Sequence, residues 1–79
     1  MPLYYFNVYN DDVTIDPEGA ELADPHAARA YAVKAARALA AETVLHGHLT
    51  GSHRIEIVDA HQKPVDIVRF GDAVDIRTD

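Results

Sequence analysis

The sequence DPHAARAYAVKAARALAAETVLHG, residues 24–47, decides the fold because it predicts one long helix in a chain of only 79 residues. Asp24 is a good N-cap, and Pro25 at the first helical position loses no hydrogen bond that the helix needs. Nine alanines lie between Pro25 and His46, and alanine is the strongest helix former. Gly47 follows, where a left-handed residue commonly ends a helix. We therefore predict a helix from Pro25 to about His46.

One face of this predicted helix carries mostly small side chains. At about 100° per residue, six positions fall on a single stripe. They are Ala28, Ala32, Ala35, Ala36, Leu39 and Thr43. Small side chains let a helix sit close against a sheet, so we predict that this stripe faces the core.

Four segments around the helix predict β-strands. Residues 3–9, LYYFNVY, are aromatic and β-branched, which favours a strand, and residues 13–15 suffice for a short strand that returns against it. After the helix, residues 53–59 and 64–70 also have the alternating pattern of strands. We interpret residues 20–22 as a connection that leads to the helix.

The predicted order β-β-α-β-β gives a single small α+β domain over residues 1–79. It is a two-layer sandwich in which the alanine-rich helix packs on one face of an antiparallel sheet of about four strands. Alternation points Tyr4, Phe6 and Val8 toward the core. The opposite face of the sheet is also largely apolar, and we predict that it forms an interface. Its candidate residues are Tyr5, Tyr9, Val58 and Val68.

The apolar content is high, but much of it consists of small side chains. Hydrophobic residues make up 48% of the chain, and 13 of them are alanine. A domain of this size buries only about 60% of its unfolded surface. Self-association would bury more, so we expect a homo-oligomer, with a dimer favoured, and another protein partner remains open.

Charge and cysteine content exclude several classes of protein. The chain has 7 Lys+Arg against 13 Asp+Glu, a formal charge of -6, so we expect no nucleic-acid partner, because such binding depends on cations at phosphates. The absence of cysteine excludes disulfides and thiolate metal sites. No apolar run approaches the roughly 18 residues of a membrane span, and no leader pattern is visible. We expect a cytoplasmic protein without membrane contact.

The 5 histidines are the main candidates for chemistry. Imidazole binds zinc, copper and nickel readily, and His46, His48 and His53 would converge if the loop after the helix lies near the third strand. Their spacing matches no established ligand pattern, so solvated loop histidines are the preferred interpretation. We predict no cofactor and no catalytic residue. We also interpret as solvated the acidic residues before the helix, Asp11, Asp12, Asp16 and Glu18.

Short motifs along the chain resemble an uncharacterised family of short bacterial proteins, a domain of unknown function. The motifs are YYF (4–6), DD (11–12), DPEGAEL (16–22), AAR (27–29 and 35–37), IEIVD (55–59) and FGDAV (70–74). The resemblance covers nearly the whole chain. It implies a small bacterial domain, and it carries over no activity.

The leading hypothesis for function is a non-enzymatic domain that acts through its sheet face, by self-association or by binding a protein. Two alternatives stand beside it. Residues 4–45 resemble HicB-like antitoxins, which place short strands before an alanine-rich helix, and an acidic antitoxin would neutralise a basic ribonuclease. The other alternative is a small ligand-binding or enzymatic domain with a pocket at an interface.

Overall fold

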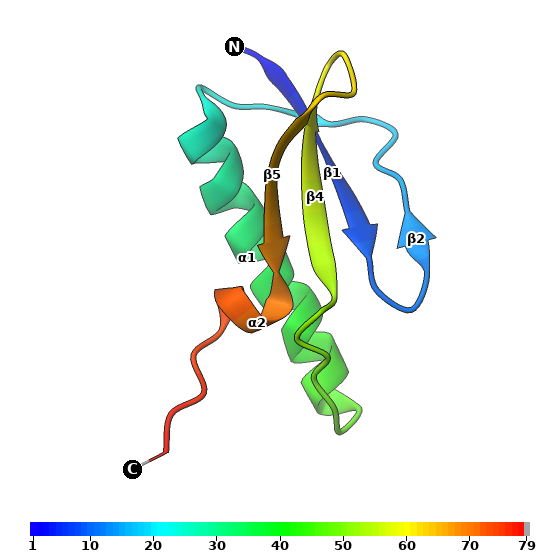
Figure 1. The fold of residues 1–79 in the computed structure, drawn as a ribbon, viewed down its shortest axis with the longest axis vertical. Helices are drawn as coiled ribbons and strands as arrows, with labels where there is room; N and C mark the ends of the chain where they lie inside the picture. Colours follow the sequence, from blue (N-terminus) through cyan, green and yellow to red (C-terminus); the bar gives the residue numbers. More distant parts are fainter. Residues whose placement is uncertain (79) are drawn as a thin grey trace.

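The computed structural model describes residues 1–78. Its elements are β1 (Leu3–Tyr9), β2 (Val13–Thr14), β3 (Ala20–Glu21), α1 (Pro25–Leu45), β4 (Arg54–Asp59), β5 (Pro64–Arg69) and α2 (Phe70–Ala73) (Figure 1). α1 packs against one face of the sheet through β4 and β5. The predicted two-layer α+β sandwich is therefore confirmed.

The sheet is antiparallel, and β1 lies inside it. The strand order is β2-β1-β4-β5, and β3 also pairs with β1, along the edge that β2 occupies. Phe6 of β1 lies opposite Ile57 of β4, and Ile55 of β4 lies opposite Val68 of β5. The strand β3 was not predicted, because Ala20 and Glu21 are residue types that strands disfavour, whereas the β-branched Val13 and Thr14 of β2 favour one.

The boundaries of α1 follow the signals in the sequence. The Asp24 side chain accepts a hydrogen bond from the Ala27 N–H at 2.8 Å, which satisfies one of the free donors of the first turn. The helix ends at Leu45, and Gly47 follows with φ 92°. Glycine adopts this left-handed conformation without strain, so it lets the chain turn back toward β4.

The core lies between α1 and the sheet. The fully buried side of α1 consists of Ala28, Ala32, Ala36 and Ala40. Ala35 and Leu39 pack at its margin, so the predicted stripe is largely confirmed. The difference is at its end, where Ala40 rather than Thr43 is buried in the core. On the sheet side, the Phe6 ring packs on Tyr31 of α1 with 4.6 Å between ring centroids. The largest fully buried side chains are Phe70, Ile55, Ile57 and Val68.

The predicted place of Val68 on the outer face is wrong. Val68 has 0% exposure and lies opposite Ile55, and directly opposite residues share a face of the sheet. β5 carries apolar residues on both faces, so alternation alone could not show which of them meets the helix. Ile67 takes the outward place instead and is 39% exposed. Phe70, which was expected to end the strand, begins α2 and is buried in the core.

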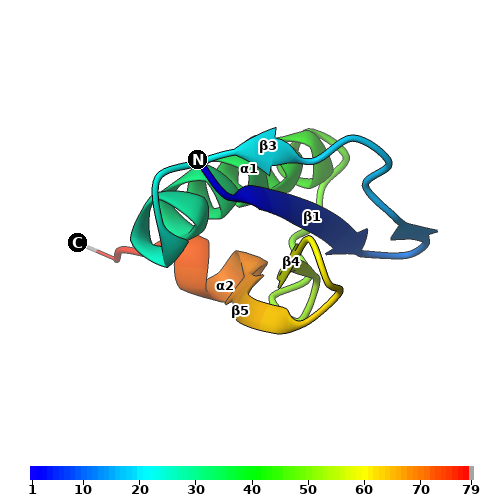
Figure 2. The same ribbon diagram turned by 90° about the horizontal axis from the view of Figure 1, so that it is seen from above.

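The opposite face of the sheet has no helix across it in residues 1–78. Seen from above, α1 forms a layer on one side of the strands (Figure 2). The short helix α2 contacts α1 and β5 and contributes Phe70 and Ala73 to the core. One face of the sheet is therefore covered by no helix of the described residues.

Candidate functional site

The outer face of the sheet consists of the side chains of β1, β4 and β5 that point away from α1. They are Leu3, Tyr5, Asn7, Tyr9, Arg54, Glu56, Val58, Ile67 and Arg69, of which Asn7 is buried. Tyr5 and Val58 lie directly opposite each other on the two central strands, β1 and β4, and both are half-buried. The face therefore has an aromatic and aliphatic centre.

Charged groups follow this centre along β4. The Arg54 guanidinium lies over the Tyr9 ring, 4.6 Å from its centroid, and this cation–π geometry is favourable. Arg54 also donates a hydrogen bond from Nε to Glu56 Oε2 at 2.7 Å. The outer face is thus an amphipathic surface, less uniformly apolar than predicted.

One edge of the sheet is capped by Asp16, in the gap that β2 and β3 leave along β1. The Asp16 carboxylate accepts a hydrogen bond from the Phe6 N–H at 3.1 Å, and its other oxygen accepts from Glu18 at 3.1 Å and Gly19 at 3.0 Å. The Asp16 N–H in turn donates to Asn7 Oδ1 at 3.0 Å. The interpretation of Asp16 as a solvated turn residue is therefore wrong, because it satisfies backbone donors that no strand reaches.

The ionised form of Asp16 stabilises the fold. Burial raises the pKa of this carboxyl, but hydrogen bonds from three backbone N–H groups lower it, and the net pKa lies below the ordinary value. A lowered pKa means that the stabilisation is present above the unfolded pKa of about 3.9 and is lost as the pH falls through the folded pKa.

We expect Asp16→Asn to lower the free energy of unfolding at pH 7 by about 1–2 kcal/mol, because the amide has no charge and only one acceptor oxygen, so its NH2 group would face a backbone N–H donor. The difference from the unmodified chain should shrink as the pH falls below about 4, where the unfolded chain takes up this proton, and it should vanish once the pH passes below the lowered pKa of the folded state. Urea denaturation across this pH range measures it. A difference that stays constant down to the lowest pH would contradict the role assigned to the carboxylate.

The opposite edge of the sheet, β5, is capped in a similar way. Asp66 accepts a hydrogen bond from the Ile67 N–H at 2.8 Å, and its other oxygen accepts from Arg29 of α1 at 2.9 Å. Burial raises the pKa of Asp66, but the bonds from Arg29 and Ile67 lower it overall. Because a side chain already occupies the Ile67 N–H, β5 is a poor template for an added strand.

The three candidate metal ligands do not form a common site. His46 and His48 are exposed after the end of α1, whereas His53 is buried. The His53 Nε2 atom lies 3.5 Å from Asp11 Oδ1, its ring meets Phe70 edge-on, and its buried Nδ1 has no hydrogen-bond partner. Within residues 1–78, no three His, Cys, Asp or Glu side chains are grouped as a metal site would require.

The sequence comparison extends over most of these elements. Residues 3–71, from the start of β1 into α2, match the family described as Domain of unknown function (DUF6894). The chain belongs to this family. No curated protein and no solved structure matches it, so the resemblance to HicB-like antitoxins has no support. In the described part of this DUF6894 member, neither helix combines the length and apolar character needed to cross a membrane.

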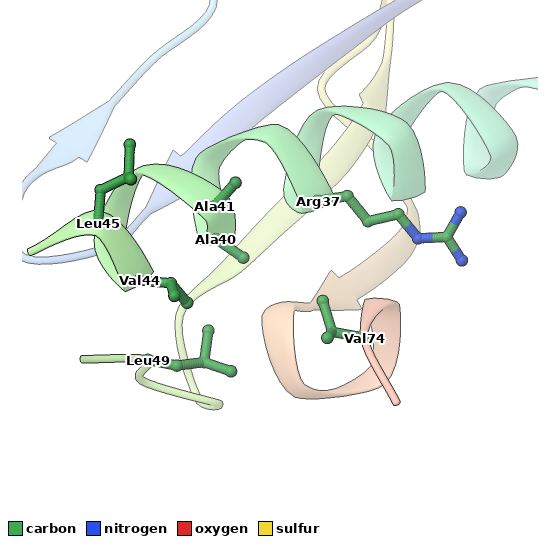
Figure 3. Close-up of a pocket in the computed structure, with 7 residues that line it drawn as sticks. All are labelled: Arg37, Ala40, Ala41, Val44, Leu45, Leu49 and Val74. Atoms are coloured by element: carbon green, nitrogen blue, oxygen red, sulfur yellow. The ribbon is translucent and has the colours of Figure 1, made fainter. Parts of the chain in front are cut away.

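The DUF6894 chain also has an apolar groove that the sequence did not reveal. Its volume is about 360 Å³, and Figure 3 shows the side chains around it, from α1, the loop before β4 and the residue after α2. They are Arg37, Ala40, Ala41, Val44, Leu45, Leu49 and Val74. The one charged member, Arg37, donates from Nε to the Ala73 carbonyl at 2.7 Å. Binding sites orient ligands with convergent polar groups, and no such set lines this groove.

Proposed function

We propose that this DUF6894 member is a non-enzymatic domain that binds protein through the outer face of its sheet. The observation that carries the proposal is the Tyr5–Val58 pair, which lies at the centre of this face with no helix over it in residues 1–78. Tyrosine and arginine are the residues that most often dominate binding energy in interfaces. Tyr9 and Arg54 lie opposite each other four residues further along the same two strands, and the Arg54 guanidinium contacts the Tyr9 ring.

The capped edges favour this face over strand addition. Asp16 and Asp66 occupy the backbone donors of Phe6 and Ile67, one on each side of the sheet. A partner that added a strand would have to displace a carboxylate from a backbone N–H. A partner that covers the face displaces neither of these carboxylates.

The partner class follows from charge and composition. The chain has a formal charge of -6, which disfavours nucleic acid and is compatible with a protein surface. Arg54 and Glu56 on the face allow a partner, a second copy included, to place opposite charges against them. We infer a small bacterial, cytoplasmic protein from the cysteine-free composition and the family pattern.

We expect Val58→Glu to abolish protein binding at this face, because it places a charge at the centre of the apolar pair. Tagged chains carrying Val58→Glu or the control Thr14→Glu, which adds the same charge at an exposed site on β2, are used to capture proteins from the native cell. Proteins held by the unmodified chain and by Thr14→Glu should be missing with Val58→Glu. Equal capture by all three chains would overturn the proposal.

A further inference from the structure

One exposed strip of α1 has a symmetric sequence about Ala38. Lys34 and Glu42 lie four positions to either side of it, and Tyr31 and Leu45 lie seven positions to either side. The two side chains of each pair are complementary in type. Lys34 and Glu42 have opposite charges, and Tyr31 and Leu45 are both large and apolar. The buried side of the helix, which is made of other alanines, takes no part in this pattern.

These side chains are exposed, although the Tyr31 ring also packs on Phe6 at one edge of the strip. Tyr31 is 48% exposed and Leu45 is 82% exposed, although both are large apolar residues. Lys34, Ala38 and Glu42 are exposed as well. Within residues 1–78, neither Lys34 nor Glu42 takes part in an ion pair.

We propose that α1 of a second copy packs antiparallel on this face, with a two-fold axis at Ala38. In such a pair, residues equidistant from the axis lie opposite each other. Lys34 then faces Glu42 of the second copy, and Tyr31 faces Leu45 of the second copy. Each contact occurs twice, so four complementary contacts arise from one arrangement.

The surface of α1 also has the shape that this pairing requires. A hollow of about 310 Å³ lies among Tyr31, Lys34, Ala35 and Ala38. The two-fold operation brings Leu45 of the second copy to Tyr31, at this hollow. The small side chains at the centre of the face let two helices approach closely. A partner without this charge pattern would leave Lys34 and Glu42 unpaired, which is why a second copy is the occupant that the face fits best.

This contact leaves the outer face of the sheet free, since α1 lies on the other side of the strands. A dimer joined through α1 presents two outer faces, so it holds two protein partners at once. The inference does not depend on the proposed function, because the two surfaces share no residue.

Charge reversal tests the pairing. We expect Lys34→Glu alone and Glu42→Lys alone to raise the dissociation constant of the dimer about tenfold or more, because each creates two like-charge contacts. The double variant Lys34→Glu/Glu42→Lys should restore the affinity, because it exchanges the two charges. Sedimentation equilibrium of the four chains measures these constants. Dissociation constants that do not differ among the four chains, or an unmodified chain that stays monomeric, would overturn the proposal.

A second pair of variants distinguishes a specific interface from nonspecific hydrophobic association. Leu45 and Ile76 are almost equally exposed, at 82% and 83%, and neither supports the core. Leu45→Ser should weaken the dimer, whereas Ile76→Ser should leave it unchanged. Equal effects of the two variants would contradict the pairing, and neither variant alters the outer face on which the proposed function depends.

Discussion

Phe70→Ala is expected to lower the free energy of unfolding by about 3–5 kcal/mol, which is the usual cost of removing a buried aromatic ring. Phe70 has 0% exposure and is the largest fully buried side chain within residues 1–78. The His53 ring meets it edge-on, and α1 contributes only alanines to the fully buried core. Alanine side chains have few atoms with which to fill a cavity on the α1 side. A domain of this size has a stability of the same order, so the variant should be largely unfolded at 37 °C.

Two further variants allow the loss of stability to be measured even if Phe70→Ala does not fold. Phe70→Leu removes less volume and should leave a folded protein with an intermediate loss of stability. Ile67→Ala, on the partly exposed side of β5, should lower the free energy of unfolding by much less. Urea denaturation gives the three free energies. A Phe70→Ala chain that is as stable as Ile67→Ala would show that the core is not organised around this ring.

Gly19→Ala is expected to destabilise the fold by about 2–4 kcal/mol, from backbone strain and steric overlap together. Gly19 has φ 73°, which disfavours any residue with a Cβ atom. A Cβ at this position would lie 2.7 Å from the Tyr4 carbonyl oxygen, so β1 or the turn must shift. That shift would also disturb the Asp16 hydrogen bonds, since the Gly19 N–H donates to this carboxylate.

Gly47 supplies the control for this substitution. It has φ 92°, but a Cβ there would meet no atom within 4 Å. Gly47→Ala therefore incurs the strain of a left-handed conformation without the overlap, which amounts to about 1–2 kcal/mol. In thermal or urea denaturation, the Gly19→Ala chain should have a clearly lower free energy of unfolding than the Gly47→Ala chain. The reverse order would contradict the packing of the turn against β1.

The helix and the faces of β1 were predictable because their signals are local. Asp24, Pro25 and Gly47 mark the boundaries of α1, and alternation over residues 3–9 separates the core side of β1 from its outer side. These signals need no knowledge of other segments. The alanine stripe was predictable for the same reason, since helix geometry alone places its members on one face.

The remaining features depend on contacts between distant segments. The face of Val68 is set by its pairing with Ile55, because β5 is apolar on both sides. The role of Asp16 depends on β1, because its carboxylate accepts a hydrogen bond from the N–H of Phe6, ten residues earlier in the chain. His53 is separated from His46 and His48 by its burial against Phe70, which a spacing in the sequence does not reveal.

The central claim, that the outer face of the sheet binds protein, is tested most directly by a photo-crosslinking aromatic residue in place of Tyr5. The substitution keeps a ring at the centre of the face, and Glu18, exposed in the turn before β3, serves as the control position. Irradiation of living cells should give a discrete heavier adduct from position 5 and none from position 18, and Val58→Glu should remove it. No adduct from position 5, or the same adducts from both positions, would contradict the claim.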